Sequence, residues 1–330
     1  MIHPAGSLSG SVITFGEPLV SFVPDSQGHL SLSQRFRPYV GGAELNTAIG
    51  LARLGIRASY AAAIGNDAFG RMILDRLRAD GVDVEHLHIA REGSTGVYFK
   101  QWAGLRGDTS VFYYRSSSPM AQGQWRSEIL RENLHSHRWT WIHTTGITGM
   151  IGDSCRTQSC ELLREAKKAG LTTSFDVNIR RKLGNMDAWR QRIEEVLQDL
   201  DWFILGHEEA HWLFGTKDST QVEENINNLG FKGEGVILKR GEMGAETSCS
   251  GRVTRVPARL VRSVVDPVGA GDGFNAGWIA GMVSGWSLEN ALRLGTVVGA
   301  FAVASAGDFD GYPYLQEALV EFEGMDGPAR

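Results

Sequence analysis

The sequence has few cysteines and no long apolar run. Its 330 residues include three cysteines, an odd number, and no two of them are spaced as C-x-x-C. A disulfide framework or a zinc site is therefore not expected, which fits a reducing cytoplasm. The sequence has no stretch of about 18 apolar residues, the length that a transmembrane helix needs. Its first residues also lack the charged and apolar regions of a signal peptide. We expect a cytoplasmic protein with no membrane partner.

The chain also lacks net positive charge. Its formal net charge is -5, whereas proteins that hold nucleic-acid backbones present basic patches. We therefore expect no nucleic-acid partner, although a small phosphorylated ligand needs only a local positive potential. Two nucleotide-binding signatures are missing as well. The sequence contains neither a G-x-x-x-x-G-K-[ST] loop nor the H-R-D and D-F-G motifs of protein kinases.

Strand-like and helix-like segments alternate along most of the chain. Strands are predicted at residues 11–16, 58–64, 139–143, 172–175, 202–205 and 235–239. Helices are predicted at residues 43–54, 69–79, 155–169, 188–200, 208–214, 273–283 and 288–305. This order predicts an α/β fold with a mostly parallel sheet between two layers of helices. Ligands of such sheets bind beyond the carboxyl ends of the strands.

Two stretches, residues 17–40 and 93–115, interrupt the alternation. They lack a helical period and contain runs typical of strands, such as G-V-Y-F at 96–99 and V-F-Y-Y-R at 111–115. Because they are interleaved with the α/β part, we expect a small sheet that projects from it. Edge hairpins and a lid over an active site are both compatible with this pattern. We expect one domain over residues 1–330, with these strands inserted in it.

The sharpest local signal is D-P-V-G-A-G-D-G-F at residues 266–274, directly before a helix. Small residues before a helix leave backbone N–H groups free to converge on an anion, and the helix dipole adds positive potential. A carboxylate there repels an anion, so Asp272 fits best as a base that takes a proton from an attacking alcohol. Two other interpretations stay open. Asp272 could simply cap the helix, or Gly271, Gly273 and Ala276 could form a dinucleotide-binding turn.

Two motifs together resemble the signatures of the PfkB, or ribokinase-like, carbohydrate kinases. One is D-P-V-G-A-G-D with G-F-N-A-G. The other is G-G-A-E-L-N-T-A at 41–48, followed by L-A-R-L-G at 51–55 and A-I-G-N-D-A-F-G at 63–70. The resemblance covers residues 11–315. It implies a three-layer ribokinase-like α/β/α fold with a small β lid. It also implies ATP and Mg²⁺ as ligands, and it indicates a place for a monovalent cation in the loop before Asp272.

The resemblance implies roles for individual residues. Asp272 would be the base, and Gly269, Ala270 and Gly271 would form the anion hole. ATP would bind near Asn178, Arg180, Lys239, Gly241, Gly244, Gly269 and Gly271. Glu209 would reach the Mg²⁺ through water, although Gly206 stands where the family often has asparagine.

Within the family, the sequence is most similar to 2-keto-3-deoxygluconate kinases. The matching segments include G-V-Y at 96–98, F-Y-Y-R at 112–115 and D-V-N-I-R at 176–180. The resemblance implies that the substrate is bound by Gly41, Gly42, Asn46, Tyr98, Tyr113, Arg115, Arg180 and Asp272. An arginine can hold a carboxylate in a bidentate fashion, which would suit a sugar acid phosphorylated at its 6-hydroxyl.

Two other functions are compatible with the same fold. A kinase of a neutral sugar, such as fructose or ribose, would leave the cations at Arg115 and Arg180 without a partner, which is costly when they are buried. A non-catalytic sugar or nucleotide sensor on the same fold would have no use for the Asp272 carboxylate. Strands with exposed edges can pair between subunits, and the family often oligomerises, so we expect a homo-oligomer, a dimer or larger.

Overall fold

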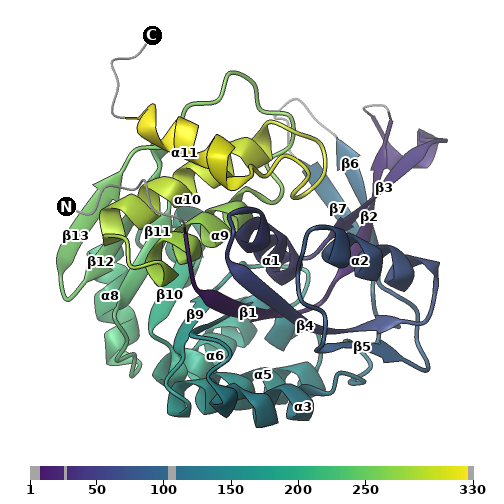
Figure 1. The fold of residues 1–330 in the computed structure, drawn as a ribbon, viewed down its shortest axis with the longest axis horizontal. Helices are drawn as coiled ribbons and strands as arrows, with labels where there is room; N and C mark the ends of the chain where they lie inside the picture. The colour runs from purple at the N-terminus through teal and green to yellow at the C-terminus, as the bar shows by residue number, and fades with distance from the viewer. Residues whose placement is uncertain (1–7, 26–27, 103–108, 326–330) are drawn as a thin grey trace.

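The computed structural model describes residues 8–25, 28–102 and 109–325. Within them the strands form two sheets, which Figure 1 shows as a broad central sheet and a smaller one at the upper right. The central sheet has nine strands. In spatial order they are β13 (Arg252–Val256), β12 (Ala245–Cys249), β11 (Gly235–Lys239), β10 (Trp202–Gly206), β9 (Thr172–Asp176), β8 (Trp141–Thr145), β1 (Ser11–Phe15), β4 (Arg57–Gly65) and β5 (Leu87–Ala90).

The central sheet is parallel from β5 to β11, and β12 and β13 extend it as antiparallel hairpins. The helices are α1 (Ala43–Arg53), α2 (Ala68–Ala79), α3 (Ser127–Asn133), α4 (Gly146–Met150), α5 (Asp153–Lys168), α6 (Met186–Val196), α7 (His207–Phe214), α8 (Ser219–Asn228), α9 (Ala270–Val283), α10 (Leu288–Val303) and α11 (Leu315–Glu323). In Figure 1, α1, α9, α10 and α11 lie on one face of the sheet, and α3, α5 and α6 on the other. The predicted three-layer fold is confirmed.

The smaller sheet, called the lid sheet here, has four strands. They are β3 (Phe36–Gly41), β2 (Leu19–Pro24), β6 (Val97–Trp102) and β7 (Thr109–Tyr114), in that order. The small sheet predicted from residues 17–40 and 93–115 is thereby confirmed. Its outer strands are β3 and β7, and β7 exposes Phe112 and Tyr114. Pairing of these edges between subunits stays a prediction.

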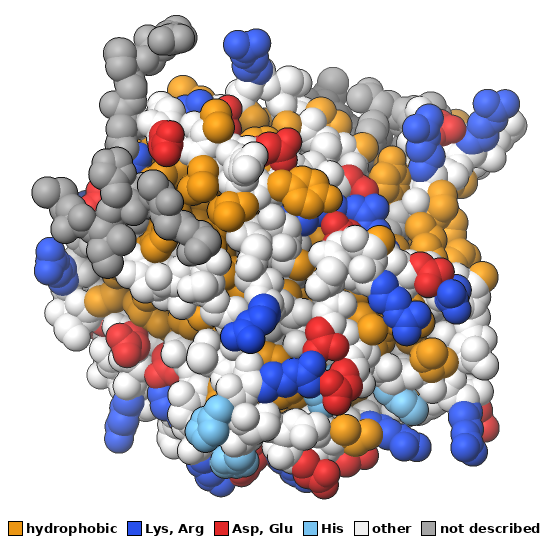
Figure 2. Space-filling model, viewed as in Figure 1, with side chains coloured by type: hydrophobic (Ala, Val, Ile, Leu, Met, Phe, Trp, Pro, Cys, Tyr) orange, Lys and Arg blue, Asp and Glu red, His pale blue; other side chains and the backbone are white. Residues whose placement is uncertain are grey.

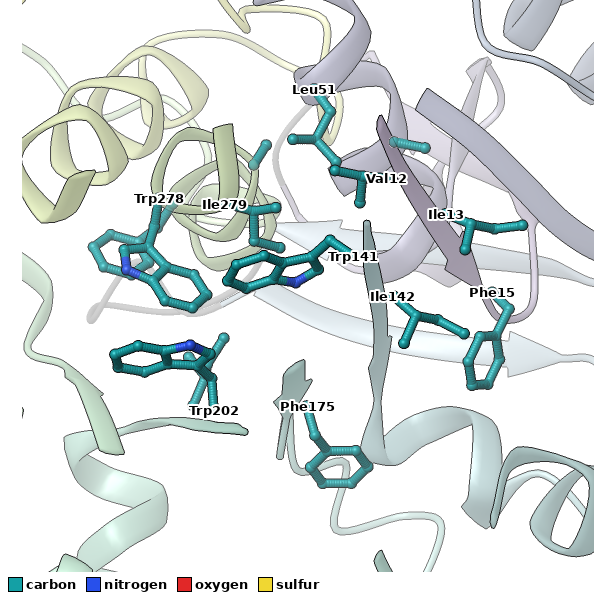
Figure 3. Packing of buried hydrophobic residues seen from close by; sticks show 14 of the residues in the cluster. Val12, Ile13, Phe15, Leu51, Trp141, Ile142, Phe175, Trp202, Trp278 and Ile279 are labelled. Carbon is teal, nitrogen blue, oxygen red and sulfur yellow. The ribbon is translucent and has the colours of Figure 1, made fainter. Parts of the chain in front are cut away.

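Three tryptophans anchor α9 on the central sheet. The ring of Trp278 packs edge-on against Trp141, at 5.4 Å between centroids, and against Trp202, at 5.2 Å. Figure 3 shows these rings meeting between the helix and strands β8 and β10. Aromatic pairs of this geometry add to the stabilisation that burial of their area provides. The anchored helix therefore has a fixed position, with its N-terminus at the carboxyl ends of the strands.

No helix within the described residues is long and apolar enough to span a bilayer. Figure 2 shows Lys and Arg side chains mixed with Asp and Glu over one face of the molecule.

Candidate active site

A cavity of about 1000 Å³ lies between the lid sheet and the carboxyl ends of the central strands. The lid side contributes Tyr98, Tyr113 and Arg115, and the body contributes the N-termini of α1 and α9. Of the predicted site residues, the cavity is lined by Gly42, Asn46, Tyr98, Tyr113, Arg115, Asn178, Arg180, Glu209, Lys239, Gly269, Gly271 and Asp272. Residues far apart in the sequence thus meet in one place, as the α/β order predicts.

Four predicted residues do not line the cavity: Gly41, Gly241, Gly244 and Ala270. Gly241 and Gly244 have φ of 57° and 93° and form the turn between β11 and β12. A side chain at Gly244 would come within 2.1 Å of a backbone oxygen, so this glycine is needed by the turn itself. A role of these four residues in binding stays a prediction.

Asp272 occupies the first turn of α9 without capping it. The helix begins at Ala270, three residues earlier than predicted, and Gly269 is its N-cap, with no side chain bonded to the exposed N–H groups. The Asp272 carboxylate instead accepts hydrogen bonds from the amides of Asn46 at 2.8 Å and Asn178 at 3.3 Å. The capping interpretation of Asp272 is therefore wrong. Two amides on α1 and on the loop after β9 orient the carboxylate toward the cavity.

The backbone at Gly269 requires glycine. Its φ is 87°, and a Cβ atom there would lie 1.8 Å from the carbonyl oxygen of Asp308. Only glycine tolerates both the left-handed conformation and the close approach. Behind it, the first turn of α9 presents N–H groups that have no carbonyl of the helix to bond. The Lys239 ammonium lies beside this turn, 3.1 Å from where a Cβ of Gly271 would be. The turn is thus a region of positive potential.

Asp272 is buried, and this changes its acidity. Burial raises the pKa of Asp272 to about 7; the hydrogen bond from Asn46 lowers it, the nearby Asp176 raises it, and the cations Lys239 and Arg180 lower it. A carboxyl group with a pKa near neutrality is suited to accept a proton from an alcohol.

The expected consequence is an acid limb in the pH profile. If an alcohol is the group that Asp272 deprotonates, kcat/KM for that alcohol should fall below pH 7, by about tenfold per pH unit once Asp272 is protonated. The measurement is steady-state turnover between pH 5 and 9. A flat profile across pH 6–8 would contradict the role of Asp272 as the titrating base.

Stability provides an independent readout of the same group. Between pH 3.8, the ordinary pKa, and about 7, the folded protein holds a proton that the unfolded chain has released. The free energy of unfolding should therefore fall as the pH rises through this window and level off above it. Urea denaturation of the wild type and of Asp272→Asn should diverge across this window, whereas parallel curves would show that Asp272 does not carry the effect.

Arg115 and Arg180 have different partners. Arg115 forms a buried ion pair with Glu17, and the Ser118 hydroxyl donates to the same carboxylate. Arg180 donates to the carbonyl of Ile179 at 3.2 Å and has no carboxylate within ion-pair distance among the described residues. The expectation that a neutral sugar would leave both cations unpaired is therefore wrong for Arg115, because Glu17 already neutralises it. The argument rests on Arg180 alone.

Tyr98 also has a partner within the protein. Its hydroxyl donates to Asp308 at 2.5 Å, so toward a sugar it can act only as an acceptor. Asp308, Glu17 and Ile147 line the cavity but were not among the predicted site residues. Asp308 lies in the G-D-F-D-G segment at residues 307–311, which also matches the 2-keto-3-deoxygluconate kinases.

Glu209 is held by backbone groups. Its two oxygens accept the N–H groups of Gly206 and Ile179, each at 2.6 Å, and burial raises its pKa, with Asp176 adding to the rise. The described residues contain no group of three or more acidic, histidine or cysteine side chains that could form a metal cage. Mg²⁺ usually keeps several waters and binds through substrate phosphates and one or two carboxylates. Glu209, with a free lone pair on each oxygen, fits such an outer role.

The fold and the site define a class of enzyme. A buried carboxylate beside a helix N-terminus, under a lid at the strand ends, is an arrangement suited to transferring a phosphoryl group to an alcohol. Comparisons with known proteins agree. The model of the pfkB family of carbohydrate kinases matches residues 9–313. The chain belongs to this family and is an ATP-dependent sugar kinase.

Relatives with curated names support the assignment. The 2-dehydro-3-deoxygluconokinase of Bacillus subtilis is 33% identical over 312 residues, covering 94% of this chain and 94% of its own. The enzyme of the same name from Thermoproteus tenax is 31% identical and covers 93% of both chains. Among solved structures, a PfkB protein from Polaromonas sp. JS666 is 30% identical, with a TM-score of 0.80 over 94% of this chain and 99% of its own. An E. coli protein assigned as ribokinase II, solved with ATP and Mg²⁺, is 26% identical, with a TM-score of 0.83 over 96% and 99%.

Proposed function

We propose that this kinase phosphorylates the 6-hydroxyl of 2-keto-3-deoxygluconate, the compound also called 2-dehydro-3-deoxygluconate. One observation carries the proposal: the Arg180 guanidinium lines the cavity and has no carboxylate partner among the described residues. Asp272 and Glu209 attract the Arg180 cation, and Tyr113 forms a hydrogen bond with it. Because no carboxylate of the described residues lies within ion-pair distance, a carboxylate of the ligand can form the close ion pair that the protein does not supply. The names of the two relatives described above support the same substrate.

The proposed chemistry uses residues of this chain in four roles. Asp272 takes the proton of the attacking hydroxyl, while Asn46 and Asn178 hold its carboxylate in place. The first turn of α9 stabilises the negative charge on the phosphoryl group during its transfer, with Lys239 beside it. The N–H of Ala270 in this turn also donates to the carbonyl of Pro267 at 3.3 Å. Arg180 holds the sugar carboxylate, with Tyr113 next to it. We propose the whole chain as one kinase domain, in which the lid sheet excludes water from this reaction.

ATP and Mg²⁺ are the proposed phosphoryl donor and metal. When bound, Mg²⁺ neutralises charge on the β- and γ-phosphates, and Glu209 is the residue placed to orient its water shell. Gly206, at the position where asparagine is frequent in the family, has an ordinary φ of -81° and a Cβ there would meet only the Glu209 side chain, at 3.3 Å. The backbone conformation at this position is therefore one that asparagine can adopt, but its Cβ would require a small shift of the Glu209 side chain.

A neutral-sugar kinase is the second candidate. The fructokinase-2 of Oryza sativa is 29% identical, in a match that spans 92% of that protein. Glu17 already neutralises Arg115, so of the two arginines only Arg180 is open to a carboxylate ligand. A substrate panel separates the two candidates.

The test is ADP release, followed by a coupled assay, with 2-keto-3-deoxygluconate, gluconate, fructose and ribose in the presence of Mg²⁺. We expect kcat/KM for 2-keto-3-deoxygluconate to exceed that for fructose and ribose at least tenfold, which corresponds to about 1.4 kcal/mol of discrimination. Phosphorus NMR of the product should place the new ester on the 6-oxygen. A preference for fructose or ribose would keep the sugar kinase and overturn the sugar acid.

A further inference from the structure

Lys100 is a charged side chain buried under the lid sheet. It lies on β6, its side chain is fully inaccessible to solvent, and its Nζ atom is 2.7 Å from Asp266 and 2.7 Å from Asp308. Burial alone would lower the pKa of Lys100, but Asp308 and Asp266 outweigh it and raise the pKa. The side chain is therefore an ammonium ion between two carboxylates. Neither the motifs nor the mechanism described above accounts for this cluster.

The two carboxylates belong to the two segments that shape the anion hole. The second oxygen of Asp266 accepts the N–H of Val268 at 3.0 Å, which bends the chain toward Gly269. Asp308 contacts the same glycine from the other side, since its carbonyl occupies the space where a Cβ of Gly269 would be. Asp308 also accepts the hydroxyl of Tyr98, which lies two residues before Lys100 on β6. The Lys100 ammonium thus joins the lid sheet to the two segments that contact Gly269, those of Asp266 and Asp308.

The charges of the cluster show what Lys100 contributes. With Lys100 the cluster carries a net charge of -1. Without it two carboxylates would face each other in a space almost closed to water, since the Asp266 side chain is inaccessible and that of Asp308 is 5% exposed. Removing one partner of a buried ion pair leaves an uncompensated charge, which costs far more than an exposed pair would. The two segments would then separate and Gly269 would lose one of its supports, unless a cation from solution took the place of the ammonium.

We propose that Lys100 is a positioning residue for phosphoryl transfer: it is a built-in cation that ties the lid sheet to the loop of the anion hole. The inference rests on the proposed function of that loop. The family resemblance indicated a place for a monovalent cation in the loop before Asp272. In this chain Asp266 of that loop is already paired with a positive charge, the Lys100 ammonium.

The proposal differs from a purely structural role in what it predicts for the folded enzyme. A structural role lowers the melting temperature and the fraction of folded protein, but each folded molecule turns over normally. A positioning role lowers turnover per folded molecule. Turnover must therefore be divided by the number of competent sites, which is measured as the stoichiometry of ADP binding by calorimetry.

The main experiment uses two variants and a control, assayed with whichever sugar of the panel reacts best. Lys100→Met should lose at least tenfold in kcat per ADP-binding site. Lys100→Ala should lose as much and regain at least fivefold in saturable propylammonium, which fills the vacated space with an ammonium ion, whereas the wild type should not respond. Arg192→Met is the control: Arg192 is equally inaccessible, but it bonds to Cys160 and Ser159 of α5, so kcat per site should stay within threefold while stability falls.

A charge-matched variant covers the case in which Lys100→Met does not fold. Lys100→Met combined with Asp266→Asn restores the net charge of -1 and removes the facing carboxylates, so this protein should fold, yet kcat per site should stay at least tenfold low. Two results would overturn the proposal: wild-type kcat per site in either Met variant, or a reduced kcat of Lys100→Ala that no ammonium ion improves. If the proposed sugar-acid substrate is wrong, only the comparison of substrates will show it. The ratios of kcat per site between variant and wild type are unaffected, because they are measured with whichever sugar reacts best.

Discussion

Asp272→Asn is expected to bind sugar and ATP with affinities near those of the wild type and to lose roughly 10²–10⁴-fold in kcat, the usual contribution of a general base. Asparagine has the shape of the aspartate but cannot accept the proton of the attacking hydroxyl. Its amide group will also face one of two amide donors, Asn46 at 2.8 Å or Asn178 at 3.3 Å. The longer contact is the weaker one, so we expect the new NH₂ to turn toward Asn178 and leave the packing intact.

Two measurements separate this effect from misfolding. Calorimetric titration with the sugar and with a non-hydrolysable ATP analogue should give one site of each per chain. Asp310→Asn serves as the matched control, because Asp310 is another acid with a pKa raised by burial but does not line the cavity. Its kcat should stay within threefold of the wild type. Near-normal turnover of Asp272→Asn would remove the assignment of the base.

The sequence predicts the order of the elements well because their apolar periods are strong. The strand at β11 has the predicted bounds, and α1 ends one residue before the predicted end, at Arg53. Element starts are less well predicted, since they depend on capping. Helix α6 begins at Met186, two residues before the prediction, because the side chain of Asn185 accepts the N–H of Ala188. Helices α3, α4, α8 and α11 were not predicted, and each has ten residues or fewer.

The residues at the site were predicted better than their partners. The two signatures bring Asn46 and Asp272 into the same site, and they do share a hydrogen bond. Two ion pairs could not be predicted, because each joins the lid sheet or its flanks to a segment far away in the sequence. They are Arg115 with Glu17 and Lys100 with Asp266. Lys100 and Asp266 are 166 residues apart, and a lysine in a strand gives no local signal of burial.

Arg180→Ala is the second change with a large expected effect. Losing a hydrogen bond to a charged group costs about 1.5–3 kcal/mol, which corresponds to roughly 10- to 150-fold in KM for 2-keto-3-deoxygluconate. The effect should be confined to acids. A neutral sugar such as fructose, tested as a poor substrate, should show little change in KM, because Arg180 has no anion to hold in that case.

Arg181→Ala is the matched control for this prediction. Arg181 lines the same cavity, but its guanidinium lies over the ring of Trp212, so its removal should change KM for the sugar acid less than threefold. Comparing the two variants separates a specific contact from a general loss of positive potential, which would weaken acid binding in both. An unchanged KM in Arg180→Ala would contradict the contact between Arg180 and the sugar carboxylate. An equal rise in KM in both variants would show that the two arginines act only by long-range attraction of the acid. Only a large loss confined to Arg180 and to acids supports a kinase whose specificity is set by one arginine in the loop after β9.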